Sequence, residues 1–382
     1  AAGAAMAGAG VRAAGAALIV TADPRGALAG AAALLHGAQP EVMAAVTGTN
    51  GKTSVASFLR QIWEGEGRST VSLGTLGIEG VVSGPLAHTT PEPVTLHRHL
   101  AACAGAGVTH AVMEASSHGL HQRRVDGVHL AAAGFSNISR DHLDYHPDFE
   151  SYFDAKAGLF TRILPPEGLA VINIAGAGGE AMAARARAAG RAVLTVGGAG
   201  ADLALLGRRR DLTGQRLRID HGGIAHEVRL DLVGDFQADN ALLAAGLAIA
   251  TGSDAPGAIA ALGRLAPVAG RMQRAAMRAG GAAIFVDYAH TPDALATALG
   301  ALRPHVMGRI AVLIGAGGDR DRGKRPLMGR AAADHADVVF VTDDNPRSED
   351  PAAIRADILQ GCPNATEIGD RAEAILRAAA AL

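Results

Sequence analysis

The sequence is poor in cysteine and in aromatic residues, and both shortages exclude classes of protein. It has two cysteines among 382 residues, Cys103 and Cys362, and aromatic residues make up 3%. Two cysteines so far apart form neither a disulfide framework nor a metal-ligand spacing. A reducing compartment is therefore the simplest interpretation.

Long apolar runs and an excess of one charge are also missing. No stretch reaches the roughly 20 apolar residues of a membrane-spanning helix, and the formal net charge is −2. The chain therefore has no global basic field for nucleic acid or an anionic membrane. The alanine-rich residues 1–20 lack the basic region of a signal peptide and lead into an expected strand at 17–21. We expect a cytoplasmic protein with no nucleic-acid or membrane partner.

What the chain does contain is typical of a globular α/β protein of two or three domains. Hydrophobic residues make up 49% and charged residues 19%. Apolar, β-branched runs alternate with helical patterns, which favours βαβ units and mostly parallel sheets. The expected strands are 43–46, 108–114, 131–137, 168–174, 191–196, 284–287, 310–314 and 338–342. The expected helices are 53–64, 149–160, 238–250, 292–302, 325–335 and 351–360. Residues 216–220 and 226–232 predict a hairpin, and a composition break near 266–280 precedes a second α/β unit.

One loop carries a phosphate-binding pattern. Residues 47–54, Thr-Gly-Thr-Asn-Gly-Lys-Thr-Ser, lie between an expected strand and an expected helix. Glycines let backbone N–H groups approach phosphate oxygens, and a helix N-terminus favours negative charge. Lys52 can reach the outer phosphates, and the Thr53 hydroxyl can ligate Mg²⁺. Gly48 and Gly51 are closer together than in the general P-loop pattern, and Gly-Lys-Thr also fits an ordinary turn. Its position between strand and helix favours a nucleotide site.

The same loop resembles the ATP loop of the Mur ligases and of their relatives, the folylpolyglutamate synthetases. Members form an acyl phosphate from a substrate carboxylate and ATP, and an amine then attacks it. The resemblance implies a central P-loop domain with a mostly parallel sheet at 41–266. It also implies a C-terminal Rossmann-like α/β domain at 267–382 and a remnant of the N-terminal UDP-binding domain at 1–40. The implied ATP-binding residues of the loop are Gly48, Thr49, Asn50, Gly51, Lys52, Thr53 and Ser54.

The resemblance also implies metal ligands. Glu114 ends an expected strand, where open α/β sheets place their ligands, and it matches the family's Mg²⁺ ligand. His142 matches the second metal-binding position. Lys156, on the expected helix 149–160, matches a lysine that relatives carbamylate, which turns a cation into an oxygen ligand suited to Mg²⁺. Without the resemblance, a lysine on a helix is typical of a solvated charge. Thr53 completes this implied metal site.

Segments near Glu114 resemble those that contact the muropeptide in the family. The segments are 88–91, His-Thr-Thr-Pro, and 122–124, Gln-Arg-Arg. Arg124 can bind a phosphate or carboxylate with both arms of its guanidinium. The family usually has Asn where this chain has His88, so His88 receives no role. The implied muropeptide contacts are Thr89, Thr90, Ser116, Gln122 and Arg124.

Further nucleotide contacts are implied in the middle of the chain. Asn137 matches a residue that contacts the nucleotide. Residues 234–240 resemble a Gly-x-x-Asn-x-x-Asn segment, in which Gln237 replaces the first Asn and Asn240 remains as the base or ribose contact.

The hinge and the following strand supply the other implied nucleotide contacts. Residues 267–273 resemble the hinge motif, whose Arg271 is expected to close on the γ-phosphate, as charge stabilisation in phosphoryl transfer requires. Gln273 stands where Glu is common. Asp287 and His290 match nucleotide-facing residues, although a plain strand–helix loop is the alternative. The implied catalytic residues are Lys52, Glu114, His142, Lys156 and Arg271.

Residues 343–351, Asp-Asp-Asn-Pro-Arg-Ser-Glu-Asp-Pro, resemble the signature of the member that adds meso-diaminopimelate. That amino acid carries a second carboxylate that lysine lacks. Arg347 can bind this carboxylate bidentately, while Asp344 and Asn345 can take the ammonium group. Arg320 is a second matching carboxylate ligand. A helix-capping turn before Pro351 is the plain alternative, but it does not explain both arginines.

We therefore expect an ATP- and Mg²⁺-dependent ligase that adds meso-diaminopimelate to UDP-MurNAc-L-Ala-D-Glu in peptidoglycan synthesis, acting as a monomer. A lysine-adding Mur ligase, a folylpolyglutamate synthetase-like ligase and a P-loop nucleotide-binding module without ligase activity remain alternatives. Both ends look cut, because the chain starts without Met and the family's Gly-Lys-Gly-His-Glu segment would follow Leu382.

Overall fold

The computed structural model describes residues 4–11, 17–142, 145–211 and 213–381. The chain divides into two compact units, each of which is built from several segments. The first unit comprises residues 1–208, 216–230 and 237–266, and the second comprises 209–215, 231–236 and 267–382. Parts of the expected N-terminal remnant, 1–3 and 12–16, lie outside the described residues. None of the helices in the described ranges is long and apolar enough to cross a membrane.

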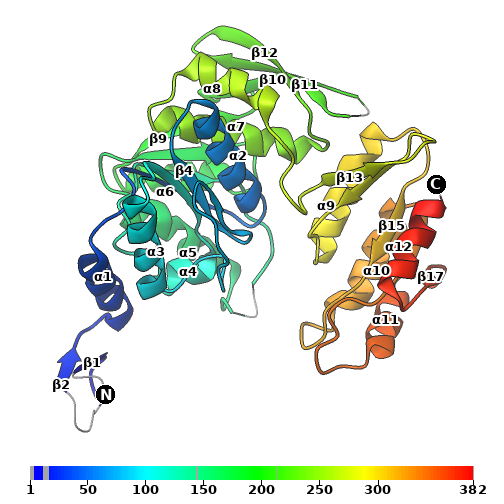
Figure 1. Cartoon of the computed structure of the whole chain (residues 1–382), viewed down its shortest axis with the longest axis horizontal. Helices are drawn as coiled ribbons and strands as arrows, with labels where there is room; N and C mark the ends of the chain where they lie inside the picture. Colours follow the sequence, from blue (N-terminus) through cyan, green and yellow to red (C-terminus); the bar gives the residue numbers. More distant parts are fainter. Residues whose placement is uncertain (1–3, 12–16, 143–144, 212, 382) are drawn as a thin grey trace. The chain divides into compact units, whose positions relative to one another are not determined.

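A 10-stranded sheet forms the centre of the first unit (Figure 1). Its strand order is β12-β11-β10-β9-β8-β7-β3-β6-β4-β5. The pairs from β10 to β4 are parallel, whereas β5 pairs with β4 antiparallel. The bounds are β3 Val42–Thr47, β4 Thr70–Gly74, β5 Gly77–Gly80, β6 His110–Glu114, β7 Ala132–Phe135, β8 Leu169–Asn173, β9 Ala192–Gly197, β10 Leu203–Arg210, β11 Gln215–His221 and β12 Ile224–Leu230. The central strands are almost fully buried, as expected for parallel strands covered on both faces.

Helices connect these strands and cover the sheet. They are α1 Pro24–His36, α2 Lys52–Gly65, α3 Pro93–Gly105, α4 Ser117–His121, α5 Phe149–Gly158, α6 Gly179–Ala188, α7 Asp235–Ala250 and α8 Ala255–Ala261. A further pair of strands, β1 Ala4–Ala7 and β2 Ala17–Val20, is parallel and precedes α1. The core gathers apolar side chains from strands and helices, including Phe135, Tyr152 and Phe160.

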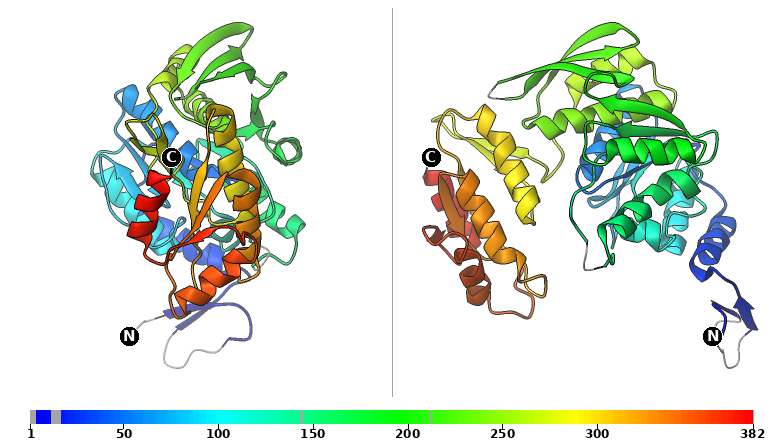
Figure 2. Two further views of the ribbon diagram at one scale, coloured as in Figure 1. Left: turned by 90° about the vertical axis from the view of Figure 1, so that its right-hand side faces the viewer. Right: turned by 180° about the vertical axis from the view of Figure 1, so that it is seen from behind.

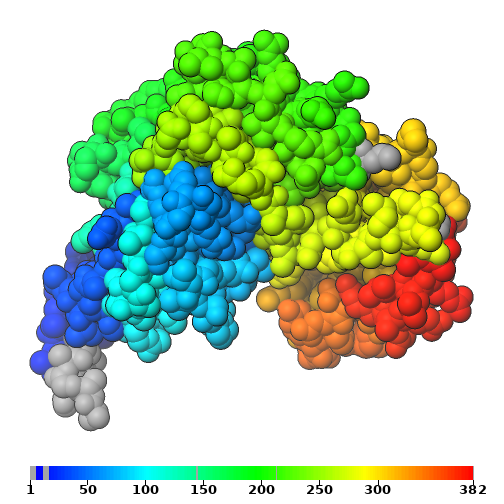
Figure 3. Space-filling view, turned by 45° about the horizontal axis from the view of Figure 1, so that its top comes forward, coloured from blue at the N-terminus to red at the C-terminus, as the bar shows by residue number. Residues whose placement is uncertain are grey.

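Segments far apart in the sequence lie side by side in this unit. Figure 3 shows α2 (blue) against the yellow-green stretch that follows α7. The Trp63 indole donates to the Thr251 hydroxyl at 3.3 Å, and the Ala266 amide donates to the Gln61 side chain at 2.7 Å. The residues that follow α7 therefore fix α2, whose first turn carries the phosphate-binding pattern.

The second unit contains a small parallel sheet and an antiparallel strand pair. The sheet has the order β15-β16-β17, with β15 Ala311–Ile314, β16 Val338–Val341 and β17 Thr366–Glu367. The pair is β13 Gln273–Met277 with β14 Ala283–Val286. The helices are α9 Pro292–Leu302, α10 Lys324–His335, α11 Pro351–Leu359 and α12 Arg371–Ala380. Figure 2 shows α9 and α10 on one side of the small sheet and α12 on the other.

The predicted strands and helices are confirmed in both units, with ends shifted by a few residues at most. The predicted hairpin is also confirmed, and it turns at Gly222 and Gly223, which have positive φ values of 61° and 81°. One predicted helix differs in its end: α5 stops at Gly158 and continues as a π-helix, Leu159–Ile163. Several elements were not predicted, among them α3 and the short strands β4, β5 and β13.

Candidate active site

The phosphate-binding pattern forms a tight loop between β3 and α2. Gly48 and Gly51 have φ values of 151° and 89°, which L side chains rarely adopt. A Cβ on Gly48 would collide with the Ser136 hydroxyl, and one on Gly51 would collide with the Asn240 carboxamide. The loop backbone therefore packs directly against these two residues. Its helix begins at Lys52, so the first-turn N–H groups of α2 point toward the loop.

Asn137 and Ser136 hold the loop from the end of β7. The Asn137 carboxamide accepts from the Asn50 amide at 3.1 Å and donates to the Asn50 carbonyl at 3.2 Å. The Ser136 hydroxyl donates to the same carbonyl at 2.6 Å, and the Asn137 carbonyl accepts from the Thr49 amide at 2.8 Å. The structure thus brings Asn137 and Asn240 to the loop, where the sequence predicted nucleotide contacts.

Lys52 folds back over the loop from its own helix. Its ammonium group donates to the Gly48 carbonyl at 2.8 Å and to the Thr49 carbonyl at 2.7 Å. A phosphate group at the loop would offer this cation a stronger, charge-assisted partner than neutral carbonyls do.

Glu114 is a buried carboxylate at the end of β6, with 1% of its surface exposed. It accepts from the Thr53 hydroxyl at 3.1 Å, from the Thr75 amide at 2.7 Å and from the Thr75 hydroxyl at 3.3 Å. A small pocket borders Thr53, Gly74 and Glu114. Thr53 and Glu114, two predicted metal ligands, are therefore in direct contact. Thr75 carries no sequence signal, because its closest contact with Glu114 is made by its backbone.

Lys156 is buried behind the loop, with 1% of its surface exposed. Its amine donates to the Gly48 carbonyl at 2.8 Å and lies 4.5 Å from the centre of the Tyr152 ring. Burial, and then the nearby Lys52 charge, hold the pKa of the Lys156 amine well below its ordinary value, while Asp141 acts in the opposite direction. A lysine on a helix is typically solvated, whereas this amine is shielded from water.

His142 lies in a group of histidines beside α4 and α5. Its backbone φ is 54°, its side chain is 42% exposed, and its ring lies 4.9 Å from that of His118. His146 is buried. Burial and the neighbouring His118, His121, His142 and Lys156 lower the pKa of His146 to about 4. Leu143 and Asp144, which follow His142 in the chain, lie outside the described residues.

No group of three or more His, Cys, Asp or Glu side chains gathers as a metal site in the described parts of the chain. The structure joins Glu114 to Thr53 and Lys156 to the loop.

The predicted muropeptide residues form a hydrogen-bonded chain next to Glu114. The Thr90 hydroxyl donates to the Glu114 carbonyl at 2.9 Å and shares a hydrogen bond of 3.0 Å with the Ser116 hydroxyl. Arg124 donates to the Thr90 carbonyl at 2.9 Å and to the Gln122 carboxamide at 2.6 Å and 3.0 Å. Thr89 meets the Thr75 hydroxyl at 3.1 Å. All five predicted residues are therefore brought together around one strand end.

Three predicted nucleotide residues of the second unit also lie close together. Asp287, after β14, accepts from the Met272 amide at 2.7 Å, directly after Arg271 in the chain. The Arg271 guanidinium lies 4.9 Å from the centre of the Tyr288 ring, which contacts the His290 ring at 5.3 Å. The loop after β14 and the hinge residues thus form one cluster.

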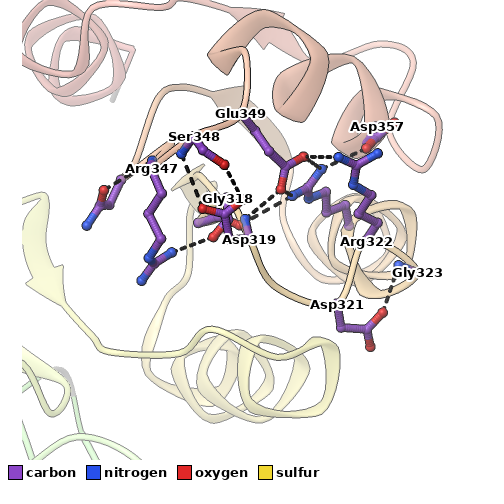
Figure 4. Close-up of polar contacts among 12 residues, drawn as sticks. Gly318, Asp319, Asp321, Arg322, Gly323, Arg347, Ser348, Glu349 and Asp357 are labelled. Carbon is purple, nitrogen blue, oxygen red and sulfur yellow. Dashed lines mark hydrogen bonds and ion pairs between the residues drawn. The ribbon is translucent and has the colours of Figure 1, made fainter. Parts of the chain in front are cut away.

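The segment 343–350 contacts the loop after β15 (Figure 4). Arg347 donates to the Gly318 carbonyl at 2.6 Å, and the Gly318 amide donates to the Asn345 carbonyl at 2.9 Å. Arg320, Asp344, Asn345 and Arg347 are all exposed. The two predicted arginines therefore stand on two loops that are joined by hydrogen bonds.

Comparisons with known proteins agree with this arrangement. The model of the Mur ligase middle domain matches residues 46–248, and that of the Mur ligase glutamate ligase domain matches residues 270–382. A UDP-N-acetylmuramoyl-L-alanyl-D-glutamate–2,6-diaminopimelate ligase of Chelativorans sp. (strain BNC1) is 54% identical over 94% of this chain and 75% of its own length. One of the same name from Bradyrhizobium diazoefficiens is 53% identical over 94% and 74%.

Solved structures show the same fold. The structure of a UDP-N-acetylmuramoyl-L-alanyl-D-glutamate–2,6-diaminopimelate ligase superposes with a TM-score of 0.70 and 36% identity, over 94% of this chain and 75% of that one. A Mycobacterium tuberculosis folylpolyglutamate synthase complexed with ADP has a TM-score of 0.76 at 24% identity, over 94% and 88%. The matched domains and the identity to these relatives establish that the chain belongs to the Mur ligase family.

Proposed function

We propose that this chain is an ATP-dependent ligase that joins meso-diaminopimelate to UDP-MurNAc-L-Ala-D-Glu. Relatives about 50% identical along nearly the whole chain carry this activity in their names. The observation that carries the choice of amino acid is the contact between the Arg347 loop and the Arg320 loop. Two exposed guanidinium groups on adjoining loops suit a substrate that brings an extra carboxylate.

The proposed ATP site is the loop of residues 48–54, with Asn137, Asn240, Arg271, Asp287 and His290 as further nucleotide contacts. Two positive-φ glycines and the start of α2 give this loop N–H groups suited to phosphate oxygens. Lys52 exchanges its two carbonyl partners for the outer phosphates. Arg271 stabilises charge on the transferred phosphoryl group.

The residues around Glu114 fit a hard cation. Mg²⁺ favours one or two carboxylates and takes its other oxygens from water and phosphate, so it needs no cluster of three acidic side chains. Thr53 and Glu114 already share a hydrogen bond, and His142 and carbamylated Lys156 are the other proposed ligands. When bound, Mg²⁺ neutralises phosphate charge.

The buried amine of Lys156 suits carbamylation. A carbamate forms when an unprotonated amine attacks CO₂, and the lowered pKa of Lys156 favours the unprotonated form. The nitrogen loses a proton, and the new carboxylate is negatively charged. The positive charge of Lys52 disfavours a buried ammonium group but would stabilise this negative carbamate.

In the proposed reaction the terminal carboxylate of the D-Glu residue attacks the γ-phosphorus of ATP, and the bond to the ADP oxygen breaks. The amine of diaminopimelate then attacks the acyl carbon, inorganic phosphate leaves, and the amine nitrogen loses a proton. The chain contributes positioning and charge neutralisation rather than acid–base chemistry. Thr89, Thr90, Ser116, Gln122 and Arg124 are the proposed muropeptide contacts.

The domain boundaries 41–266 and 267–382, a monomeric state and a cytoplasmic location belong to the same proposal. The alternatives predict different chemistry: lysine as the amine, a glutamate-adding folate ligase, or nucleotide binding without ligation. Asp344, Asn345 and Arg347 favour diaminopimelate over lysine, because an Arg347 left without its carboxylate discriminates against lysine.

The test is amine-dependent phosphate release by the protein in the length that its gene encodes. Reactions contain ATP, Mg²⁺ and UDP-MurNAc-L-Ala-D-Glu, with meso-diaminopimelate, L-lysine or no amino acid. We expect release with diaminopimelate only, and its loss without the muropeptide. Release with lysine instead would keep the family but reject the role of Arg347. ATP binding without release under any of these conditions would favour the non-catalytic module.

A further inference from the structure

Two loops of the second unit are locked together next to the proposed amino-acid contacts. The first follows β15 and contains Gly317, Gly318 and Asp319, and the second follows β16 and runs from 343 to 350. A Cβ on Gly318 would collide with the Pro346 carbonyl, so the two backbones touch directly. The loops follow neighbouring parallel strands, which explains why they meet.

Both loops contain a strained residue that is not glycine. Asp319 has φ 53° and Arg347 has φ 49°. Aspartate tolerates this left-handed conformation better than most residues, but arginine gains nothing from it locally. Such a conformation persists only when surrounding contacts hold it, and strained residues of this kind gather at functional sites. The backbone of Arg347 is therefore held by its neighbours.

Asp319 and Ser348 supply one of these restraints, which we call the Asp319–Ser348 clasp (Figure 4). The Asp319 carboxylate accepts from the Ser348 amide at 3.2 Å and from the Ser348 hydroxyl at 2.6 Å. Ser348 directly follows Arg347, so the clasp fixes the peptide unit through which the Arg347 backbone leaves the loop. Two hydrogen bonds to Ser348 restrict rotation of this peptide unit as well as the distance between the two loops.

Glu349 anchors the clasp from the other side. Its carboxylate accepts from the Asp319 amide at 2.6 Å and from both arms of Arg325, at 2.8 Å and 3.1 Å. Hydrogen bonds from Arg325, then that from the Asp319 amide, with smaller contributions from the charges of Arg322 and Arg325, lower the pKa of Glu349 to about 2. Arg325 is 1% exposed and also contacts Asp357, so this anchor belongs to the packed interior.

The clasp itself differs from this anchor because both of its side chains are exposed. Exposed hydrogen bonds contribute little to global stability, but they can select one conformation of a surface loop. Removing the anchor would damage the unit, whereas removing the clasp would free Arg347 in an otherwise intact fold.

We propose that Asp319 is a positioning residue for amino-acid selection, which fixes Arg347 through Ser348 so that its guanidinium can receive the distal carboxylate of diaminopimelate. This inference rests on the proposed function. The Arg347 guanidinium donates to the Gly318 carbonyl at 2.6 Å, next to Asp319 in the chain, so backbone and side chain of Arg347 are held by the same short segment. Asp319 acts through Arg347 and does not itself contact substrate.

The test compares Asp319→Ala with Asp319→Asn by steady-state kinetics. Asn keeps an acceptor for the Ser348 amide, and its NH₂ group can donate to the Ser348 hydroxyl, so it conserves the clasp without the charge. For Asp319→Ala we expect the KM for meso-diaminopimelate to rise about tenfold, the scale of one charge-assisted hydrogen bond. The KM for ATP and kcat should stay within about twofold of wild type. In Asp319→Asn, the KM for meso-diaminopimelate should return most of the way to the wild-type value.

Two further comparisons separate positioning from a general structural effect. Ser348→Ala loses only the 2.6 Å hydrogen bond and retains the amide contact, so a smaller rise in the same KM is expected. This variant also serves if alanine at the strained position 319 prevents folding. In an Arg347→Ala background, Asp319→Ala should add no further change, because its effect passes through Arg347.

The outcomes are distinct. A wild-type KM for diaminopimelate in both Asp319→Ala and Ser348→Ala would overturn the inference, as would an undiminished effect of Asp319→Ala in the Arg347→Ala background. Equal defects in the Ala and Asn variants would assign the role to charge and reject the clasp. A wild-type protein without diaminopimelate-dependent phosphate release would remove the proposed function and the inference together.

Discussion

The buried amine of Lys156 makes a measurable prediction about how stability depends on pH. Lys156 is 1% exposed, and burial and Lys52 lower the pKa of its amine in the folded protein. In the unfolded chain the same amine titrates near its ordinary value, about 10.4. Between the two pKa values the unfolded chain therefore binds one proton more than the folded protein. By linkage, stability must rise with pH in this window.

The expected slope follows from one proton. It amounts to about 1.4 kcal/mol per pH unit wherever the folded amine is already neutral and the unfolded one is still charged. Below the folded pKa the cost of burying the charge is fully present, and above the unfolded pKa it disappears. Lys156→Met keeps an unbranched side chain and has no proton to bind. The unfolding free energy of this variant should therefore lack this slope. As pH rises toward 10, the unfolding free energy of the wild type should increase relative to that of the variant.

The assay is urea unfolding followed by the fluorescence of Trp63, the single tryptophan. Trp63 is buried in α2 of the same unit as Lys156, so its signal reports the relevant transition. The buffers must be free of CO₂, because a carbamate would remove the titrating amine. Lys52→Met controls for the loss of one positive charge at the same loop. Parallel pH profiles for wild type and Lys156→Met would refute the reasoning, since they would show that burial leaves Lys156 protonated.

Three further predictions concern the candidate site. Arg347→Ala should raise the KM for diaminopimelate about a hundredfold and change lysine use much less, as measured by phosphate release; an unchanged ratio would exclude a role in selectivity. Gly48→Ala must place a Cβ on the Ser136 hydroxyl at φ 151°, so calorimetry should show ATP binding weakened at least about tenfold in a folded protein. Glu114→Gln should lower the affinity for Mg²⁺ in titrations of activity, and EDTA should abolish wild-type activity until Mg²⁺ is restored; activity that survives EDTA would contradict the metal proposal.

The sequence predicted the parts of the site that depend on strand ends. The buried run before Thr47 and the helical pattern after Lys52 place the phosphate loop without further information. Glu114 is predicted in the same way, as the last residue of an apolar strand. Local pattern suffices here because a parallel strand reveals itself by hydrophobicity and its end by the first polar residue.

Other contacts could not be predicted, because they use backbone groups or burial that depends on distant residues. The closest contact of Thr75 with Glu114 is made by the Thr75 amide, and any residue except proline offers an amide. Lys156 and Arg325 both lie on helices, where long cations are typically solvated, yet each is 1% exposed. β4 and β5 lack the continuous apolar run by which β3, β7 and β8 were predicted.

Both units assemble their candidate residues by the register of parallel strands. In the first unit β3 pairs Val46 with Glu114 on one side and Thr47 with Phe135 on the other, so the phosphate loop, the carboxylate and Ser136 leave the sheet together. In the second unit β15 pairs Ile314 with Val341, so the loops carrying Asp319 and Arg347 also leave side by side. A strand shifted by one residue would separate each set while keeping every local motif. Short motifs therefore predict which residues act, but the sheet register decides which of them meet.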